Sequence, residues 1–290
     1  MTESEEKTPF IDDLPPLREV INSNGLRAEK SFGQNFLLDL NLTRKIARQA
    51  GDLSGKHVIE IGPGPGGLTR ALLNSEAKTV TAIEFDKRCI DALQPVKDKA
   101  GKRLNLIHGD ALQCDLTQIV PNTPRVIIAN LPYNIATPLL ISWLRKIHED
   151  NGNFDAMVLM FQKEVADRII ATPKDKAYGR LAVISQWLCQ CHTAMTLPPS
   201  AFTPPPKINS GVVYFKPRAE RAIAEFSTVE KITAAAFGQR RKMVRQSLKA
   251  YTEFFEEVGI DPTARAENIE VDTFIRLAHR IDHIHQNPQP

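Results

Sequence analysis

Residues 57–67 of the chain, HVIEIGPGPGG, join an apolar segment to a glycine-rich loop. The residues that follow, LTRALL at 68–73, have the apolar spacing of a helix. Glycines at such a turn let the backbone approach a ligand closely at the start of the helix. A strand, a glycine loop and a helix in this order predict a ligand site at the end of a buried strand, and a dinucleotide is one interpretation of that ligand.

Similar apolar, β-branched segments follow this stretch and alternate with helical patterns. The predicted strands are HVIEI (57–61), TVTAIE (79–84), LNLIH (104–108), RVIIA (125–129) and AMVLMF (156–161). The helical patterns lie near 66–74, 86–99 and 136–149. Such alternation predicts an α/β fold with a parallel, doubly wound sheet. Two later segments, 184–195 and 211–216, predict further strands that form an antiparallel, hairpin-like pair at one sheet edge.

The C-terminal part of the chain has a different pattern, because the strand signals cease after Pro217. A stripe at steps of three and four residues predicts one face of a continuous helix, formed by Met243, Val244, Ser247, Leu248, Tyr251, Phe254, Phe255 and Val258. We predict four parts in the chain: an acidic extension at 1–30, an α/β domain at 31–218, a small all-helical domain at 219–285 and a tail at 286–290.

Length and composition exclude several classes of protein. The chain has 290 residues, of which 42% are hydrophobic, so it can bury a sizeable core. No segment approaches the roughly 18 to 20 consecutive apolar residues of a membrane span, and the acidic, polar N-terminus does not resemble a signal peptide. We therefore expect a cytoplasmic protein without a membrane partner.

The cysteines predict neither disulfides nor a metal site. Cys89, Cys114, Cys189 and Cys191 are too few and too irregularly spaced for a disulfide framework. The pair at 189 and 191 has no second pair to complete a zinc site. We interpret all four as reduced packing residues.

Two acidic residues stand at the ends of the next two predicted strands. Glu84 follows Gly62 by 22 residues, the spacing at which a carboxylate accepts both hydroxyls of a ribose. The alternative for Glu84 is a solvated acid at a strand end. Asp110, in the sequence HGDA, is placed to accept from the amino group of an adenine. These features fit S-adenosylmethionine and NAD equally well, because both ligands contain adenosine.

The sequence Asn130-Leu131-Pro132-Tyr133 follows the fourth predicted strand, and it distinguishes between the S-adenosylmethionine and NAD interpretations. The Asn130 side-chain carbonyl and the Leu131 backbone carbonyl are suited to accept hydrogen bonds from an exocyclic amine, while the Tyr133 ring stacks on its heterocycle. The alternative is an ordinary turn. No histidine, lysine or tyrosine is suggested as the proton donor of a hydride-transferring enzyme, so we favour a methyltransferase. Phe202 is a candidate for the second face of the base, with a core aromatic as the alternative.

The chemistry of such a transfer makes few demands on the protein. The sulfonium donor is already activated, so neither a nucleophile nor a metal is needed, and the protein positions the groups. Hydrogen bonds from the adenine N6 amine to Asn130 and Leu131 favour a pyramidal nitrogen with an available lone pair. The base must leave its stack at a cost of a few kcal/mol, and each base–aromatic contact offsets about 1 to 3 kcal/mol.

The charge is distributed unevenly, although the formal net charge is only +3. Residues 1–13 contain five acidic residues and one lysine, whereas residues 238–249 contain five basic residues and no acidic one. The basic set predicts contacts to phosphates and consists of Arg240, Arg241, Lys242, Arg245 and Lys249. The alternative is a solvated helix face. Arg240 falls on the apolar side of such a helix, so it is also a candidate for the helix start.

The assembled motifs resemble the ribosomal RNA adenine dimethyltransferases, most closely the bacterial enzymes that act on 16S rRNA. The resemblance covers residues 31 to about 284 and includes KSFGQNFL (30–37), EIGPGPGGLT (60–69), IEFD (83–86), GDAL (109–112), NLPYNIATP (130–138), FQKEVADR (161–168), AFTPPPKINS (201–210) and AFGQRRKMVRQSL (236–248). It implies a Rossmann-like, class I S-adenosylmethionine-dependent methyltransferase sheet and a helical rRNA-binding domain. The implied cofactor-binding set is Asn35, Leu37, Gly62, Gly64, Glu84, Asp110, Ala111 and Asn130.

The resemblance also implies the substrate and the target-base site. The substrate would be 16S rRNA in an immature small ribosomal subunit, in which two adjacent adenosines of the 3′-terminal hairpin loop become N6,N6-dimethyladenosine. The target-base residues are Asn130, Leu131, Pro132, Tyr133 and Phe202. A monomer with a role in subunit assembly is expected. Two departures are a longer, more acidic N-terminal extension and the loop residues 65–67, where the family varies.

Three rival functions remain open from the sequence. A DNA adenine methyltransferase shares an acceptor motif that begins with asparagine and ends in an aromatic residue, but the helical C-terminal domain and Leu131 argue against it. A 23S rRNA methyltransferase has a related core, but residues 239–248 and 201–210 favour the 16S substrate. A non-catalytic assembly factor could keep the same fold, although the intact acceptor motif and Glu84 argue against lost catalysis.

Overall fold

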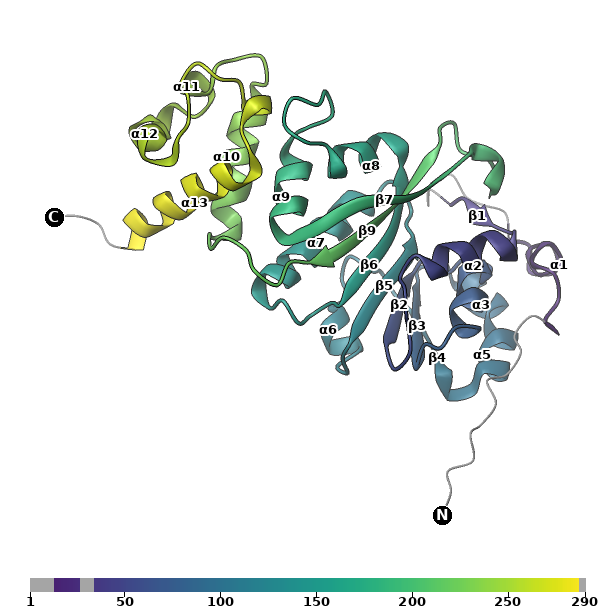
Figure 1. Cartoon of the computed structure of the whole chain (residues 1–290). Coiled ribbons are helices and arrows are strands. Elements are labelled where there is room, and N and C mark those ends of the chain that lie inside the picture. The colour runs from purple at the N-terminus through teal and green to yellow at the C-terminus, as the bar shows by residue number, and fades with distance from the viewer. Residues whose placement is uncertain (1–12, 27–33, 287–290) are drawn as a thin grey trace. The chain divides into compact units, whose positions relative to one another are not determined.

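The structure is a computed structural model, which describes residues 13–26 and 34–286. It contains a seven-stranded sheet in the order β4-β3-β2-β5-β6-β9-β7. The five predicted strands are confirmed within one residue as β2 (His57–Ile61), β3 (Thr79–Glu84), β4 (Leu104–His108), β5 (Arg125–Asn130) and β6 (Ala156–Gln162). These five strands pair in parallel, as predicted for an α/β fold (Figure 1).

The strands form because their residues are apolar on both faces. Every residue of β2 is buried, and β3, β5 and β6 are buried along almost their whole length. A parallel sheet needs such strands, since helices cover both of its faces. The flanking helices follow the strands in the sequence: α3 (Gly67–Leu73), α4 (Lys87–Ala92), α5 (Gln94–Ala100), α6 (Leu116–Ile119) and α7 (Ala136–Glu149). The carboxyl ends of β2, β3, β4 and β5 consequently lie along one edge of the sheet.

The two later strand predictions are confirmed in part. β9 (Ser210–Pro217) and β7 (Cys189–Leu197) are neighbours at one edge of the sheet, as predicted. The segment 184–188 is not a strand, because α9 (Arg180–Leu188) continues through it. Its residues are buried on almost every side, and a short apolar run of this kind does not distinguish a buried strand from a buried helix.

The N-terminal part contributes a second, two-stranded sheet. After α1 (Leu17–Ser23), the strand β1 (Phe36–Leu37) pairs in antiparallel fashion with β8 (Phe202–Thr203). In this register Leu37 lies opposite Phe202. The helix α2 (Leu40–Arg48) begins directly afterwards, with the Asp39 side chain accepting hydrogen bonds from the backbone N–H groups of residues 41 and 42. The N-terminal segment is thereby fixed beside the glycine loop.

The C-terminal part is helical, but the continuous helix predicted from the apolar stripe is wrong. The helices are α10 (Phe226–Gly238), α11 (Val244–Ser247), a 3₁₀ helix at Lys249–Phe254, α12 (Phe255–Val258) and α13 (Val271–Gln286). The chain leaves the helical conformation at Leu248, whose φ and ψ are −113° and 32°. Val244, Leu248, Phe255 and Val258 are nevertheless buried, because successive short helical turns keep them on the inner side.

The chain divides into two compact units. The first comprises residues 1–142, 152–163 and 193–214, and the second comprises residues 143–151, 164–192 and 215–290. The second unit includes α9 and the end of α7 besides the C-terminal helices, whereas the boundary between 218 and 219 stays a prediction. Among the described residues, no helix is both long and apolar enough to cross a membrane.

Candidate active site

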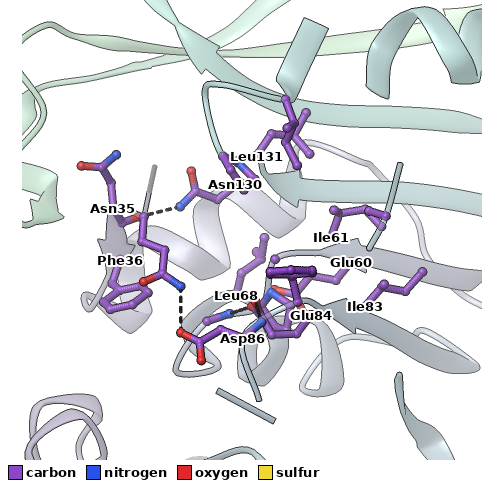
Figure 2. A pocket seen from close by; sticks show the side chains of 18 of the residues that line it. Asn35, Phe36, Glu60, Ile61, Leu68, Ile83, Glu84, Asp86, Asn130 and Leu131 are labelled. Atoms are coloured by element: carbon purple, nitrogen blue, oxygen red, sulfur yellow. Dashed lines mark hydrogen bonds between the residues drawn. The ribbon is translucent and has the colours of Figure 1, made fainter. Parts of the chain in front are cut away.

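A pocket in the first unit opens at the carboxyl ends of β2, β3, β4 and β5 (Figure 2). The predicted cofactor-binding residues all line it: Asn35, Leu37, Gly62, Gly64, Glu84, Asp110, Ala111 and Asn130. Leu131 and Pro132 of the acceptor motif line it as well. The structure therefore brings together residues from five separate segments of the sequence, although their roles toward a ligand stay predictions.

The glycine loop depends on conformations that other residues rarely adopt. Gly62, Gly64 and Gly66 have φ angles of +69°, +54° and +93°, which glycine reaches without steric cost. At Gly67 the reason for glycine is space, because an added Cβ would lie 2.3 Å from the carbonyl oxygen of Leu37. The loop thus lets α3 begin in close contact with β1, and both elements border the pocket.

Glu84 is part of the folded loop and is not a solvated acid. Its side chain is 7% exposed, and its two oxygens accept hydrogen bonds from the backbone N–H groups of Gly64 at 3.0 Å and Asp86 at 2.9 Å. Burial raises the pKa of Glu84, while these two backbone hydrogen bonds lower it. Each carboxylate oxygen has a second lone pair, so both oxygens can still accept from the hydroxyls of a ribose.

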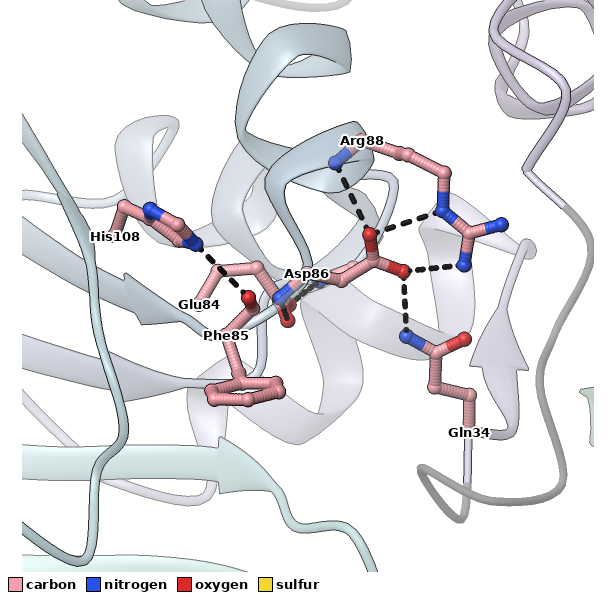
Figure 3. Close-up of polar contacts among 7 residues, drawn as sticks. Gln34, Glu84, Phe85, Asp86, Arg88 and His108 are labelled. Atoms are coloured by element: carbon pink, nitrogen blue, oxygen red, sulfur yellow. Dashed lines mark hydrogen bonds and ion pairs between the residues drawn. The ribbon is translucent and has the colours of Figure 1, made fainter.

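A polar network continues from Glu84 along the end of β3 (Figure 3). Asp86 accepts hydrogen bonds from the Arg88 guanidinium at 3.0 Å and 2.7 Å and from the Gln34 side chain at 3.3 Å. The Arg88 contacts keep the pKa of Asp86 below its usual value. His108 makes a 3.0 Å hydrogen bond to the carbonyl oxygen of Phe85. Through Gln34, this network connects the N-terminal segment to the sheet edge.

The end of β4 provides an acidic group to a pocket that two exposed apolar side chains also line. Asp110 accepts a hydrogen bond from the backbone N–H of Leu112 at 2.9 Å. Phe85 and Leu112, which are 59% and 42% exposed, also line the pocket. A flat heterocycle would gain contact with both apolar side chains and a hydrogen bond to the acid. Phe85 and Leu112 were missed when the site was predicted from the sequence. Their positions could have indicated them, because Phe85 directly follows Glu84 and Leu112 lies two residues after Asp110.

The acceptor motif is oriented by the N-terminal segment. The Asn130 Nδ2 donates a 2.9 Å hydrogen bond to the backbone carbonyl of Asn35 (Figure 2). Because a carbonyl can only accept, this contact assigns the Nδ2 to Asn35 and leaves Oδ1 as the atom that can accept from a ligand amine. Leu131 is 2% exposed, so the backbone at this point is firmly held. The motif therefore presents an amide oxygen in a fixed orientation at the pocket, and its role toward an amine stays a prediction.

Neither of the two predicted aromatic residues is part of the lining of this pocket, and both stacking roles stay predictions. Tyr133 does not line the pocket among the described residues, and its hydroxyl is 2.6 Å from the Ser210 hydroxyl. Burial raises the pKa of the Tyr133 phenol. Phe202 is 3% exposed and packs in the hydrophobic core, which corresponds to the alternative of a core aromatic. The structure does not place Phe202 at the pocket, so its stacking role stays a prediction.

Sequence reasoning also missed Glu60. This residue belongs to β2, is 1% exposed and lines the pocket. Its Oε2 has no hydrogen-bond partner, and burial raises its pKa to about 8. The sequence HVIEI did not indicate that Glu60 is buried at the pocket, because sequence alone does not distinguish an acid buried within an apolar strand from one that is exposed at the end of the strand.

The chain is similar to one family of known proteins over most of its length. The family model described as "Ribosomal RNA adenine dimethylase" matches residues 25–283. The chain belongs to the ribosomal RNA adenine dimethylase family. Its similarity to "Ribosomal RNA small subunit methyltransferase A" is 55% identity with the Xanthobacter autotrophicus protein, over 93% of this chain and 94% of that one. The Rhodospirillum rubrum protein of the same name is 54% identical, again over 93% and 94%.

Solved structures agree with the family assignment. A dimethyladenosine transferase from Plasmodium falciparum has a TM-score of 0.73 and 26% identity, over 84% of this chain and 96% of that one. The 23S rRNA methyltransferase ErmE has a TM-score of 0.64 and 23% identity, over 86% and 100%, and this likeness concerns the fold alone. Membership in the dimethylase family confirms the predicted fold class and enzyme class, and it excludes the oxidoreductase interpretation.

The five basic residues of this dimethylase-family chain that were predicted to contact phosphates are of two kinds. Arg241, Lys242, Arg245 and Lys249 are exposed. Arg240 instead forms an ion pair with Glu267, at 2.7 Å, and contacts the carbonyl oxygen of Asp175. It lies in the turn after α10 and does not begin a helix. Within the described part of the chain, no group of three or more histidine, cysteine, aspartate or glutamate residues is arranged to hold a metal ion.

Proposed function

We propose that the chain transfers methyl groups from S-adenosylmethionine to the N6 amines of two adjacent adenosines in the 3′-terminal hairpin loop of 16S rRNA, within immature small ribosomal subunits. The family assignment and the names of its relatives support this substrate. The observation that carries the proposal is the Asn130 amide, which the Asn35 carbonyl holds at the pocket with Oδ1 available to an amine.

The residues of the pocket fit the proposed methyl donor. Glu84 would accept hydrogen bonds from the ribose hydroxyls, and Asp110 would accept one from the adenine amine. Phe85 and Leu112 would contact the adenine ring. The lining has four carboxyl side chains and, among the described residues, no lysine, arginine or histidine, which suits a ligand with a positive charge. When bound, S-adenosylmethionine supplies an activated methyl group on a sulfonium.

The protein's own contribution is to orient the acceptor amine. Asn130 Oδ1 and the Leu131 carbonyl would take both N6 hydrogens, so the nitrogen lone pair is directed away from them and toward the methyl group. Preorganised hydrogen-bonding groups of this kind are a large source of rate enhancement in enzymes. The nitrogen becomes acidic after transfer and loses its proton to solvent, so no strong base is required.

The test of this function is a labelling experiment. Unmethylated 30S subunits, 50S subunits and duplex DNA are each incubated with labelled S-adenosylmethionine and the protein, and modified nucleotides are mapped. We expect label on the N6 positions of two adjacent adenosines near the 3′ end of 16S rRNA. Label in 23S rRNA or DNA, or no label in any substrate, would contradict the proposal.

The parts of the chain have separate roles in this proposal. Residues 31–218 would form the methyltransferase domain and residues 219–285 the rRNA-binding domain. A cytoplasmic location and a monomeric state belong to the same proposal. Light scattering on the purified chain measures its oligomeric state.

The exposed basic residues of the helical region make a prediction about salt dependence. Replacing Arg241, Arg245 and Lys249 together with glutamine should weaken binding to small subunits and reduce the slope of log affinity against log salt by about 2 to 3. Each phosphate contact contributes roughly 0.7 to 0.9 to that slope through counterion release. Filter binding between about 50 and 200 mM salt measures it.

A matched triple variant controls for the loss of net charge. Lys45, Arg48 and Lys102 are exposed in the first unit, and replacing them with glutamine removes the same charge. We expect this control to change the slope by less than the first triple variant. Equal slopes for the first triple variant and the wild type would show that these residues do not contact rRNA.

A further inference from the structure

Glu60 is a buried carboxyl group, and one of its two oxygens has no hydrogen-bond partner. It is 1% exposed, in a strand whose five residues are all buried, and its Oε2 accepts no hydrogen bond. Burying an ionised carboxylate without a partner is strongly unfavourable, so such a group becomes neutral or meets an opposite charge. The reason for an acid at this position therefore lies in what enters the pocket that it lines.

The other carboxyl groups of the pocket differ from Glu60 because the protein stabilises their charge. Asp86 is paired with the Arg88 guanidinium, and Glu84 accepts two backbone hydrogen bonds. Asp110 accepts a hydrogen bond from a backbone N–H group at 2.9 Å. The Oε2 of Glu60 has no such partner, although Glu60 lines the same pocket (Figure 2).

β2 pairs with β3 on one side and with β5 on the other. The titratable residue of β5, Arg125, lies opposite His57 at the far end of β2, and the groups that act on the pKa of Glu60 come from β3 and α3. On β3, Glu84 is a like charge and raises the pKa of Glu60 further beyond the effect of burial. On α3, the Thr69 hydroxyl lowers that pKa. The resulting pKa of about 8 means that Glu60 is mostly protonated in the ligand-free protein at neutral pH. No lysine, arginine or histidine lines this pocket in the described ranges.

We propose that Glu60 distinguishes the cationic methyl donor from the uncharged thioether product: it ionises when a sulfonium ligand occupies the pocket and is protonated when the thioether replaces it. The inference rests on S-adenosylmethionine as the donor. On donor binding, the carboxyl O–H bond breaks, its electron pair stays on oxygen, and the proton passes to solvent. After methyl transfer the sulfonium has become a thioether, and Glu60 takes a proton back from solvent.

This exchange gives the pocket a selective preference for substrate over product. Donor and product share the adenosine and the amino acid and differ by one methyl group and one positive charge. Attraction between two unit charges about 4 to 6 Å apart, at an effective dielectric constant of about 20, corresponds to roughly 100- to 1000-fold in affinity. Deprotonating a carboxyl group with a pKa of about 8 at pH 7 costs about 10-fold of this, so the net preference is about 10- to 100-fold. Loss of this attraction after each transfer favours release of the product.

Calorimetry of the wild-type protein tests the inference. Binding of S-adenosylmethionine and of S-adenosylhomocysteine is measured at pH 7 in two buffers with different ionisation enthalpies, which gives the number of protons released. The same titrations are made with Glu60→Gln, which replaces the acid by a neutral group of the same shape. Because each ligand's own amine titrates equally in both proteins, the difference between the proteins reports Glu60. We expect up to one additional proton released by the wild type with the donor, and none with the product.

The pH dependence provides the second measurement. A group that is ionised in the complex but protonated in the free protein makes binding tighter as the pH rises toward the pKa of the free protein. The wild-type preference for donor over product should thus increase from pH 6 to about 8, relative to Glu60→Gln, and then level off. Glu76→Gln, a change of the same chemistry at an exposed residue in the turn after α3, should behave as the wild type.

Carbon-13 NMR of the glutamate carboxyl groups is measured on the wild type, so this test does not depend on the folding of Glu60→Gln. A buried carboxyl resonance should move to the ionised position with the donor and remain at the protonated position with the product. Equal proton release by wild type and Glu60→Gln, or a carboxyl resonance unaffected by the donor, would overturn the inference while leaving the proposed function intact. If the wild type binds neither ligand, the proposed function is wrong and this inference falls with it.

Discussion

Replacing Asn130 with alanine should lower the rate of methyl transfer by about 10²- to 10³-fold, the typical effect of removing one oriented hydrogen-bonding group from an active site. The Asn130 amide is held at 2.9 Å from the Asn35 carbonyl, so its remaining oxygen is fixed before the adenosine arrives. Alanine removes that oxygen, and the N6 amine loses one of the two acceptors that orient its lone pair. Single-turnover methylation of 30S subunits measures the rate directly.

The expected loss concerns the chemical step and not the binding of the subunit. Affinity for small subunits should remain within a few-fold of the wild type, because we assign rRNA binding to other residues. Asn122→Ala, in an exposed loop, is the matched control and should methylate at the wild-type rate. Methylation by Asn130→Ala at the wild-type rate would reject the oriented amide as the acceptor-binding group.

Replacing Gly67 with alanine should destabilise the first unit by about 2 to 4 kcal/mol and remove most of its cofactor affinity. The added Cβ would lie 2.3 Å from the Leu37 carbonyl oxygen and 3.2 Å from the Leu17 side chain. The first of these is a backbone atom of another element, so neither rotamer change nor side-chain movement relieves the overlap. Either α3 or β1 must shift, and both border the pocket.

Thermal unfolding and calorimetry with S-adenosylmethionine measure the two effects of Gly67→Ala. The melting temperature should fall by about 5 to 10 °C. Gly238→Ala provides the control, because nothing lies within 4 Å of a Cβ added at Gly238. Gly238 is also the last residue of α10, where alanine changes stability by at most about 1 kcal/mol. Equal stability of the two variants would show that α3 and β1 are not in tight contact.

Most of the sheet was predictable from the sequence because its central strands are buried on both faces. The segments 57–61, 79–84 and 125–129 are short, β-branched and bounded by loops, so length and composition indicate strands. The same signal was misleading at 184–188, where α9 is buried on almost every side. In the C-terminal part, spacing identified the buried positions but not the interruption at Leu248, because turns of α-helix and 3₁₀ helix give similar spacing.

The pocket lining was predictable where a polar side chain stands at the end of a buried strand. Asn130, Glu84 and Asp110 follow that rule and line the pocket. Asn35 contributes its backbone carbonyl to Asn130, and backbone contacts leave no trace in the residue type. Only the family resemblance identified that segment. Arg240 differs from its basic neighbours because of Glu267, an ion-pair partner that sequence proximity does not reveal.

The pairing of β1 with β8 has a consequence for the synthesis of the protein. The segment that carries Asn35 and Leu37 is held by residues 202–203, which lie far along the chain. A nascent chain that has produced β2 to β6 already contains the glycine loop, Glu84, Asp110 and Asn130, but it still lacks the partner strand of β1. A chain that ends before residue 203 would thus carry every residue that lines the pocket but not the strand that pairs with β1, so the wall of the pocket formed by β1 is completed late in translation.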